Sequence, residues 1–100
     1  MDERKEPRLT YSSMKVLKAF MENPMGELAG AEIHKLASVG TGTLYPILLR
    51  FEAAGWLKSR WEAIDPKEAG RPRKRLYHLT PDGMARASAA LGTFGVEAFA

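Results

Sequence analysis

The stretch GTGTLYPILLRFEAAGWLKSRW (residues 40–61), followed by GRPRKRLYHL (residues 70–79), decides the fold of this chain. Apolar residues at steps of three and four predict a helix that begins near Thr41 or Thr43, with Leu44, Ile47, Leu48 and Phe51 facing the core. We expect a threonine to cap this helix. Pro46 places its start nearby, because proline is tolerated only within the first turn or so. Gly55 suits the left-handed residue that follows a helix.

A strand pair follows the helix. Residues 57–62 alternate polar and apolar side chains, and residues 75–79 form the return strand. We expect Trp61 to pack on the core from its strand and Trp56 to lie half-buried at the helix-to-strand corner. A helix followed by a hairpin with a cationic tip is the outline of a winged helix-turn-helix.

The residues before this stretch predict two more helices. The first begins near Thr10, with Thr10 or Ser12 as its N-cap. It carries Met14, Leu17, Phe20 and Met21 on one face and ends at Asn23-Pro24. Residues 26–30 read as a turn. A short helix over residues 31–37 has three inward residues: Ile33, Leu36 and Ala37.

The C-terminal segment predicts a helix with a second apolar face. Thr80 is its expected N-cap and Pro81 its first residue. Met84, Ala87, Leu91, Phe94 and Ala98 recur at steps of three and four, which is typical of a dimerisation seam. Gly92 and Gly95 weaken the helix there.

Together these elements predict an α+β, mostly α fold: a winged helix-turn-helix with a two-stranded wing hairpin and a C-terminal dimerisation helix. We expect a flexible N-terminal arm over residues 1–8, a winged-helix domain over residues 9–80 and the dimerisation helix and tail over residues 81–100.

Composition is consistent with one globular domain. The chain has 100 residues, of which 45% are hydrophobic and 27% charged, and a formal net charge of +3. The absence of cysteine excludes a disulfide framework and thiolate metal ligands. The charged N-terminus lacks the apolar stretch of a signal peptide, so the cytoplasm is the expected location.

Positive charge is concentrated in the predicted wing. Five cations and one anion lie between Lys67 and Arg75, a local net charge of +4. A hairpin tip of this charge suits contact with phosphates, although a solubilising loop that protects a sheet edge is the plainer alternative. Beside the helix that begins near Thr41, phosphate contact is favoured. The expected DNA-binding residues are Thr41, Thr43, Tyr45, Pro46, Arg50, Arg71, Arg73, Lys74 and Arg75.

The residues do not predict catalysis. His34 and His78 belong to different elements, and neither has a carboxylate or a second histidine at metal-ligand spacing. No nucleophile–base pair and no paired carboxylates are indicated. We therefore expect a non-enzyme without metal or cofactor.

Several motifs together resemble the PadR family of transcriptional regulators over roughly residues 9–91. These motifs are GTLYPxLxRFExxGWL (residues 42–57), GRPRK (residues 70–74) and YHLTPDG (residues 77–83). The resemblance implies a dimer that binds a palindromic operator and represses transcription, with Thr43, Tyr45 and Pro46 on the recognition helix and Arg71 to Lys74 in the wing. It also implies that the C-terminal helix dimerises, and that a small aromatic effector is possible.

Two further hypotheses remain open. The apolar tail could make the chain a winged-helix protein-interaction module instead of a DNA-binding regulator. Trp56 and Trp61 could also form an aromatic-ligand sensor, because tryptophan near a dimer cleft can sandwich flat molecules.

Overall fold

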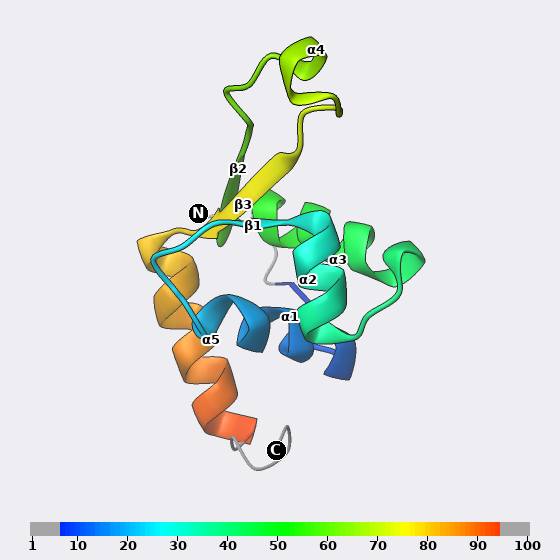
Figure 1. Ribbon diagram of the computed structural model, residues 1–100. Coiled ribbons are helices and arrows are strands. Elements are labelled where there is room, and N and C mark those ends of the chain that lie inside the picture. The colour runs from blue at the N-terminus through cyan, green and yellow to red at the C-terminus, as the bar shows by residue number, and fades with distance from the viewer. Residues whose placement is uncertain (1–6, 95–100) are drawn as a thin grey trace.

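The computed structural model describes residues 7–94, with side chains described through Gly92. The elements, in chain order, are α1 (Tyr11–Met21), β1 (Leu28–Ala29), α2 (Gly30–Ala37), α3 (Thr41–Ala53), β2 (Leu57–Trp61), α4 (Pro66–Ala69), β3 (Arg75–Leu79) and α5 (Pro81–Phe94). Four longer helices form a body, and the β2–β3 hairpin extends away from it (Figure 1). The predicted mostly helical α+β fold with a wing is therefore confirmed.

Helix α1 begins where the sequence predicts. Thr10 is its N-cap: its side chain accepts a hydrogen bond from the Ser13 backbone N–H (3.1 Å), and the Ser13 hydroxyl oxygen accepts one from the Thr10 backbone N–H (2.8 Å). This reciprocal pair satisfies two N–H groups that the helix itself leaves unbonded. Residues 1–6 of the expected arm (residues 1–8) lie outside the described residues, and so does the tail from residue 95 onward.

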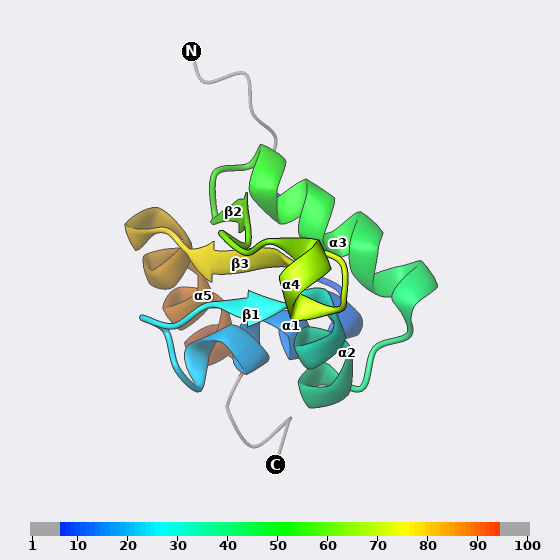
Figure 2. The same cartoon turned by 45° about the horizontal axis from the view of Figure 1, so that its top comes forward.

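The sheet has three strands, not the two that the sequence predicts. Its order is β1-β3-β2, and both pairings are antiparallel. Leu28 and Ala29 form β1 by pairing with Tyr77 and Leu76, in a segment that the sequence reads as a turn. Two residues are too few to show an alternating pattern, so only pairing across a large sequence separation makes them a strand. Figure 2 shows β3 between its two neighbours.

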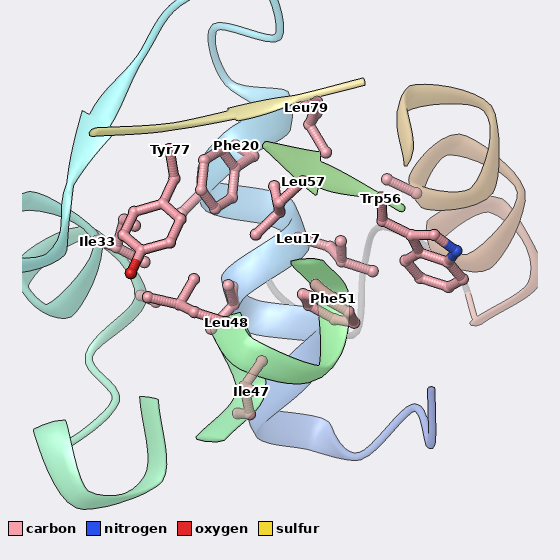
Figure 3. Close-up of a cluster of buried hydrophobic side chains, with 14 of the residues drawn as sticks. Leu17, Phe20, Ile33, Ile47, Leu48, Phe51, Trp56, Leu57, Tyr77 and Leu79 are labelled. Atoms are coloured by element: carbon pink, nitrogen blue, oxygen red, sulfur yellow. The ribbon is translucent and has the colours of Figure 1, made fainter. Parts of the chain in front are cut away.

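Apolar side chains from α1, α2, α3, the sheet and α5 share one core (Figure 3). The expected core face of α3, formed by Leu44, Ile47, Leu48 and Phe51, is buried. Leu36 is 53% exposed, so its expected inward position in α2 is wrong. Within the eight residues of α2, Ile33 and Ala37 already supply the buried face.

Both tryptophans differ from their expected positions, since Trp56 is more buried and Trp61 more exposed than the sequence predicts. Trp56 is only 4% exposed and stacks on Phe51 with ring centroids 5.2 Å apart, whereas Trp61 is 58% exposed. Leu57 and Trp61 are at opposite ends of β2, about 13 Å apart at the usual strand rise. The alternating pattern is correct in placing Trp61 on the same face of β2 as Leu57. However, β2 extends beyond the core at Trp61, so this face is exposed there.

A close junction fixes α5 against the body. Thr80 caps α5 as expected: its Oγ1 accepts from the Gly83 N–H (2.9 Å) and donates to the Gly55 carbonyl (2.7 Å). Gly55 has φ 81°, as predicted for the residue that ends α3. Gly83 lies against the Trp56 backbone, where a Cβ atom would overlap the Trp56 carbonyl oxygen. Beyond this junction, α5 packs on α1.

Candidate nucleic-acid interface

The first half of α3 presents small and polar residues to solvent. Gly40 is the N-cap of this helix and makes no side-chain cap hydrogen bond, so the expectation that a threonine caps it is wrong. The helix begins with main-chain hydrogen bonds alone, because the Gly40 carbonyl accepts from the Thr43 and Leu44 N–H groups (3.0 and 2.8 Å). The side chains of Thr41, Thr43, Tyr45 and Pro46 are all exposed.

Pro46 is the sixth residue of α3, somewhat deeper than the first turn. Because proline has no N–H, the carbonyl of Gly42 receives no helical hydrogen bond from it. The first turn of α3 therefore offers both backbone N–H groups and the Gly42 carbonyl on an uncovered helix end.

The wing cations fall into two groups. Arg71 is ion-paired with Glu62 (Nη1–Oε1 2.6 Å). Arg75 donates to the Ser59 hydroxyl (3.0 Å), lies 3.8 Å from the Glu52 carboxylate and sits over the Trp61 ring. Among the described residues, no carboxylate lies within ion-pair distance of Lys67, Arg73 or Lys74. All three side chains are exposed. Arg73 Nε donates to the Ile64 carbonyl (3.0 Å), which leaves the rest of its guanidinium, like the ammonium groups of Lys67 and Lys74, available to an anionic partner.

Glu62 organises the wing loop. Its carboxylate accepts from the Arg71 guanidinium and from the Lys74 backbone N–H (2.8 Å). The hydrogen bond from Arg71, with that from Lys74 next in size, lowers the pKa of Glu62 from its ordinary value to about 2. At the base of the wing, Arg60 forms a bidentate pair with Glu27 (2.7 and 2.8 Å), which ties β2 to the segment before β1. The Arg60 guanidinium is therefore already engaged in an intramolecular ion pair.

Helix α3 and the wing meet around one hollow of about 410 Å³, here called the α3–wing hollow. Tyr45 lines it from α3, Arg73, Lys74 and Arg75 from the wing, Tyr77 from β3 and Gly30 from the start of α2. The exposed side of the helix and the positive charge of the wing therefore lie on the same side of the molecule. A single rod-shaped polyanion could touch both.

Two exposed residues of α3 lie outside the α3–wing hollow. Arg50 is exposed in the last turn of α3, within the helix as expected. Leu49 is 69% exposed, and the sequence reasoning assigned it no role. Its signal was available in the run Ile47-Leu48-Leu49, because three consecutive residues of a helix cannot all face one core.

The tryptophans do not form a shared ligand site. Trp56 is buried in the core, whereas Trp61 lines the α3–wing hollow and also a second, apolar hollow of about 730 Å³ on the wing, together with Glu62, Pro66, Pro72 and Arg73. An aromatic-ligand site that uses both rings is therefore wrong, because they are separated by the length of β2. Trp61 alone remains accessible.

The predicted dimerisation residues differ in their surroundings. Ala87 is fully buried within the chain, where α5 packs on the body, so it offers no surface to a partner in this arrangement. Met84 and Leu91 are half-buried. The side chain of Phe94 and all of Ala98 lie outside the described residues.

The part of the chain that the structure describes has neither a metal-binding cluster nor a membrane-spanning helix. There, no three histidines, cysteines or carboxylates come together in a way that could hold a metal ion. None of its helices has the length and apolarity needed to cross a membrane.

The sequence and the fold are similar to those of known proteins. Residues 16–89 match the model of the transcriptional regulator PadR-like family. No curated protein matches the chain in sequence. A PadR family transcription regulator from Clostridium difficile is 21% identical over 85% of this chain and 88% of its own, with a TM-score of 0.69.

Two other solved structures share the fold. Reduced AbfR bound to DNA is 26% identical over 81% of this chain and 53% of its own, with a TM-score of 0.63; AbfR comes from Staphylococcus epidermidis. Bordetella bronchiseptica BpsR, whose DNA binding is regulated by 6-hydroxynicotinic acid, is 24% identical over 85% of this chain and 55% of its own, with a TM-score of 0.68. The chain thus spans about half the length of AbfR and BpsR.

The chain belongs to the PadR-like family of transcriptional regulators, because the family model covers most of its length. This membership confirms the family that the motifs of residues 42–83 indicated. Members of this family are transcriptional regulators and not enzymes, as the sequence predicted for this chain.

Proposed function

We propose that this protein binds a palindromic operator as a homodimer and represses transcription. The observation that carries the proposal is the α3–wing hollow, which unites the exposed helix residue Tyr45 with the wing cations Arg73 and Lys74. In this arrangement α3 enters the major groove, and the wing contacts the flanking phosphates or the minor groove. In a dimer, two such helices would reach successive major grooves about 34 Å apart. The DNA-bound structure of AbfR, a protein of similar fold, supports this assignment.

The side-chain environments order the expected DNA contacts. Thr41, Thr43, Tyr45 and Pro46 are proposed to lie in or beside the groove, with Arg50 further along the helix on the DNA backbone. Arg73 and Lys74 are the principal phosphate contacts of the wing. Arg71 and Arg75 are secondary, because each must leave or share an intramolecular carboxylate before it can serve DNA fully.

The test compares Arg73→Ala with Tyr45→Ala on a sequence selected from random DNA and on random duplex. Arg73→Ala should weaken both complexes and flatten the logarithmic salt dependence by about one unit, because one phosphate contact with its released counterion is lost. Tyr45→Ala should weaken the selected complex more than the random one. Binding is measured by gel shift over a salt series.

Lys58→Ala is the matched control, since Lys58 is an exposed cation of β2 outside the α3–wing hollow. It should leave the salt dependence unchanged. Wild-type binding by both Arg73→Ala and Tyr45→Ala would contradict the proposed interface. A monomer without DNA affinity at low salt would instead favour the protein-interaction module.

A specific observation favours a small aromatic effector as a second function. The wing hollow beside Trp61 combines an exposed indole with Pro66 and Pro72, and Arg73 stands at its edge. Flat molecules that stack on tryptophan suit such a surface. Planar compounds should quench the fluorescence of the wild-type protein but not that of Trp61→Phe. If none of them quenches it, the chain has no such effector among the compounds tested.

A further inference from the structure

Tyr77 is an unusual member of the α3–wing hollow. Its side chain is 8% exposed, yet in the described part of the chain its hydroxyl has no hydrogen-bond partner. Every fully buried side-chain oxygen or nitrogen there has a partner, so the Tyr77 hydroxyl keeps some solvent exposure, and the residue itself lines the α3–wing hollow. Figure 3 shows the ring extending from β3, with its oxygen at the far end near Ile33. A buried ring thus presents one unused polar atom to the hollow.

The start of α2 brings further donors to the same place. Ala29 is the N-cap of α2 and has no side chain that could cap it; Glu32 accepts only the Ala29 N–H (2.9 Å). The N–H groups of Gly30 and Ala31 have no partner within the helix. The hydroxyl of Tyr45 lies directly above Gly30, where a Cβ atom would overlap it.

The wing supplies the positive charge. Arg73 and Lys74 line the hollow without a carboxylate of their own, whereas Arg75 is already held by Ser59 and Glu52. Two tyrosine hydroxyls, a helix N-terminus and two cations therefore converge on one space. Such donors together suit an oxyanion, and a phosphate group can accept from several of them at once.

We propose that the α3–wing hollow seats one backbone phosphate of the bound duplex, and that the Tyr77 hydroxyl donates a hydrogen bond to it. This inference rests on the proposed function, because it assigns a contact within the same interface. A duplex that touches both α3 and the wing must pass a strand across the gap between them, which is where the hollow opens. Burial raises the pKa of Tyr77, so the phenol remains a proton donor at neutral pH. The seat fixes the position of the strand and carries no base specificity.

Tyr77→Phe tests the assignment, because it removes one oxygen and keeps the buried ring. We expect its affinity for selected and random duplex to fall by the same factor, about tenfold, as for the loss of a hydrogen bond to a charged group. The salt dependence should not change, because a neutral phenol releases no counterion. The unchanged salt dependence distinguishes Tyr77→Phe from Arg73→Ala, for which the slope of log affinity against log salt concentration should become shallower. Tyr11→Phe, an exposed tyrosine outside the hollow, should bind as wild type does.

Single methylphosphonate substitutions in the selected duplex locate the contact. At one position in each half-site, the neutral methylphosphonate should weaken DNA binding by the wild-type protein. At that position it should cause little further loss of affinity in the Tyr77→Phe variant. Additive losses at every position, or wild-type affinity of Tyr77→Phe, would overturn the proposal. Thermal unfolding of Tyr77→Phe checks that the fold is kept, and Gly30→Ala, whose new methyl group displaces the Tyr45 hydroxyl, should weaken binding independently.

Inorganic phosphate separates a failure of this inference from a failure of the proposed function. Phosphate should shift the Gly30 amide resonance in the wild-type protein and not in Tyr77→Phe. A Tyr77-dependent shift without coupling to any duplex phosphate would mean a seat for a free anion, which overturns the assignment to DNA. Failure to bind any duplex would refute the proposed function itself, and the inference with it.

Discussion

Single side chains decide which wing charges can serve a polyanion. Arg71 and Arg75 are engaged by Glu62 and Glu52, whereas Arg73 and Lys74 have no carboxylate within ion-pair distance among the described residues. Glu62 also accepts the Lys74 N–H, so this carboxylate orders the loop that carries Arg73 and Lys74. The residue that shapes the wing is therefore an anion, although the sequence draws attention to its cations.

The pH dependence of Glu62 follows from its hydrogen bonds. Its pKa is about 2 in the folded protein, against an ordinary value of 4.5. The stabilising contribution is complete above about pH 4.5, declines as the unfolded chain takes up the proton first, and is lost as the pH falls through about 2. An NMR titration should show the Glu62 carboxyl and the Lys74 amide changing together near pH 2.

The Glu62→Gln variant is the control for this titration, since its Lys74 amide should lack that transition. A Glu62 carboxyl that titrates near 4.5 would show that Arg71 does not hold it in solution. Loss of the carboxylate at neutral pH should also release Arg71, which would then raise low-salt affinity for random DNA.

At the scale of elements, the junction between β3 and α5 is closely packed. Thr80 bonds to Gly55 and caps α5 through Gly83, and the Thr80 N–H donates to the Trp56 carbonyl (3.0 Å). Gly83 is required here by proximity, because its neighbour is backbone and cannot rotate away. This junction sets the direction in which α5 leaves the body.

Gly83→Ala should therefore destabilise the protein by about 2–3 kcal/mol, as expected for overpacking against a fixed group. Gly92 provides a matched comparison, since it lies in the same helix and a Cβ atom there meets nothing within 4 Å. Gly92→Ala should stabilise by up to about 1 kcal/mol, because alanine favours the helix. Urea unfolding measures both, and equal effects of the two substitutions would contradict this account of the junction.

In the whole molecule, α5 buries one face on the body and leaves Met84 and Leu91 half-buried. Ala87 and Ala90 are buried where α5 packs on the body, while Met84 is half-buried outside the core cluster. A dimer formed through α5 would therefore use Met84 and Leu91, and would place the two wings and α3 helices away from the shared contact. The hairpin projects from the opposite end of the body to the end of α5 in Figure 1.

Met84→Glu should shift the protein from the proposed dimer toward its 11.1 kDa monomer in analytical ultracentrifugation, because a charge would enter the apolar contact. Affinity for a full operator should fall, whereas affinity for a single half-site should be retained. Ala85→Glu is the control, since Ala85 is exposed one residue away on a different side of the helix. A monomeric wild-type protein, or a dimer unaffected by Met84→Glu, would exclude this contact.

The sequence by itself determined the elements whose signals are local. The Thr10 and Thr80 caps, the left-handed Gly55 and the apolar stripe of α3 depend on neighbours a few residues away, so periodicity and capping chemistry suffice to predict them. The family motifs likewise lie within continuous segments. The fold class and the positions of α3 and the wing followed from these signals.

Only the tertiary structure decided which residues meet across long separations. Strand β1 exists through its pairing with β3, Arg60 is neutralised by Glu27 and Arg75 lies near Glu52. Trp61 is exposed because its strand has left the body, and Tyr77 presents its hydroxyl to a hollow shared with α2, α3 and the wing. Such contacts depend on how the elements pack in space, which no local pattern of residues specifies.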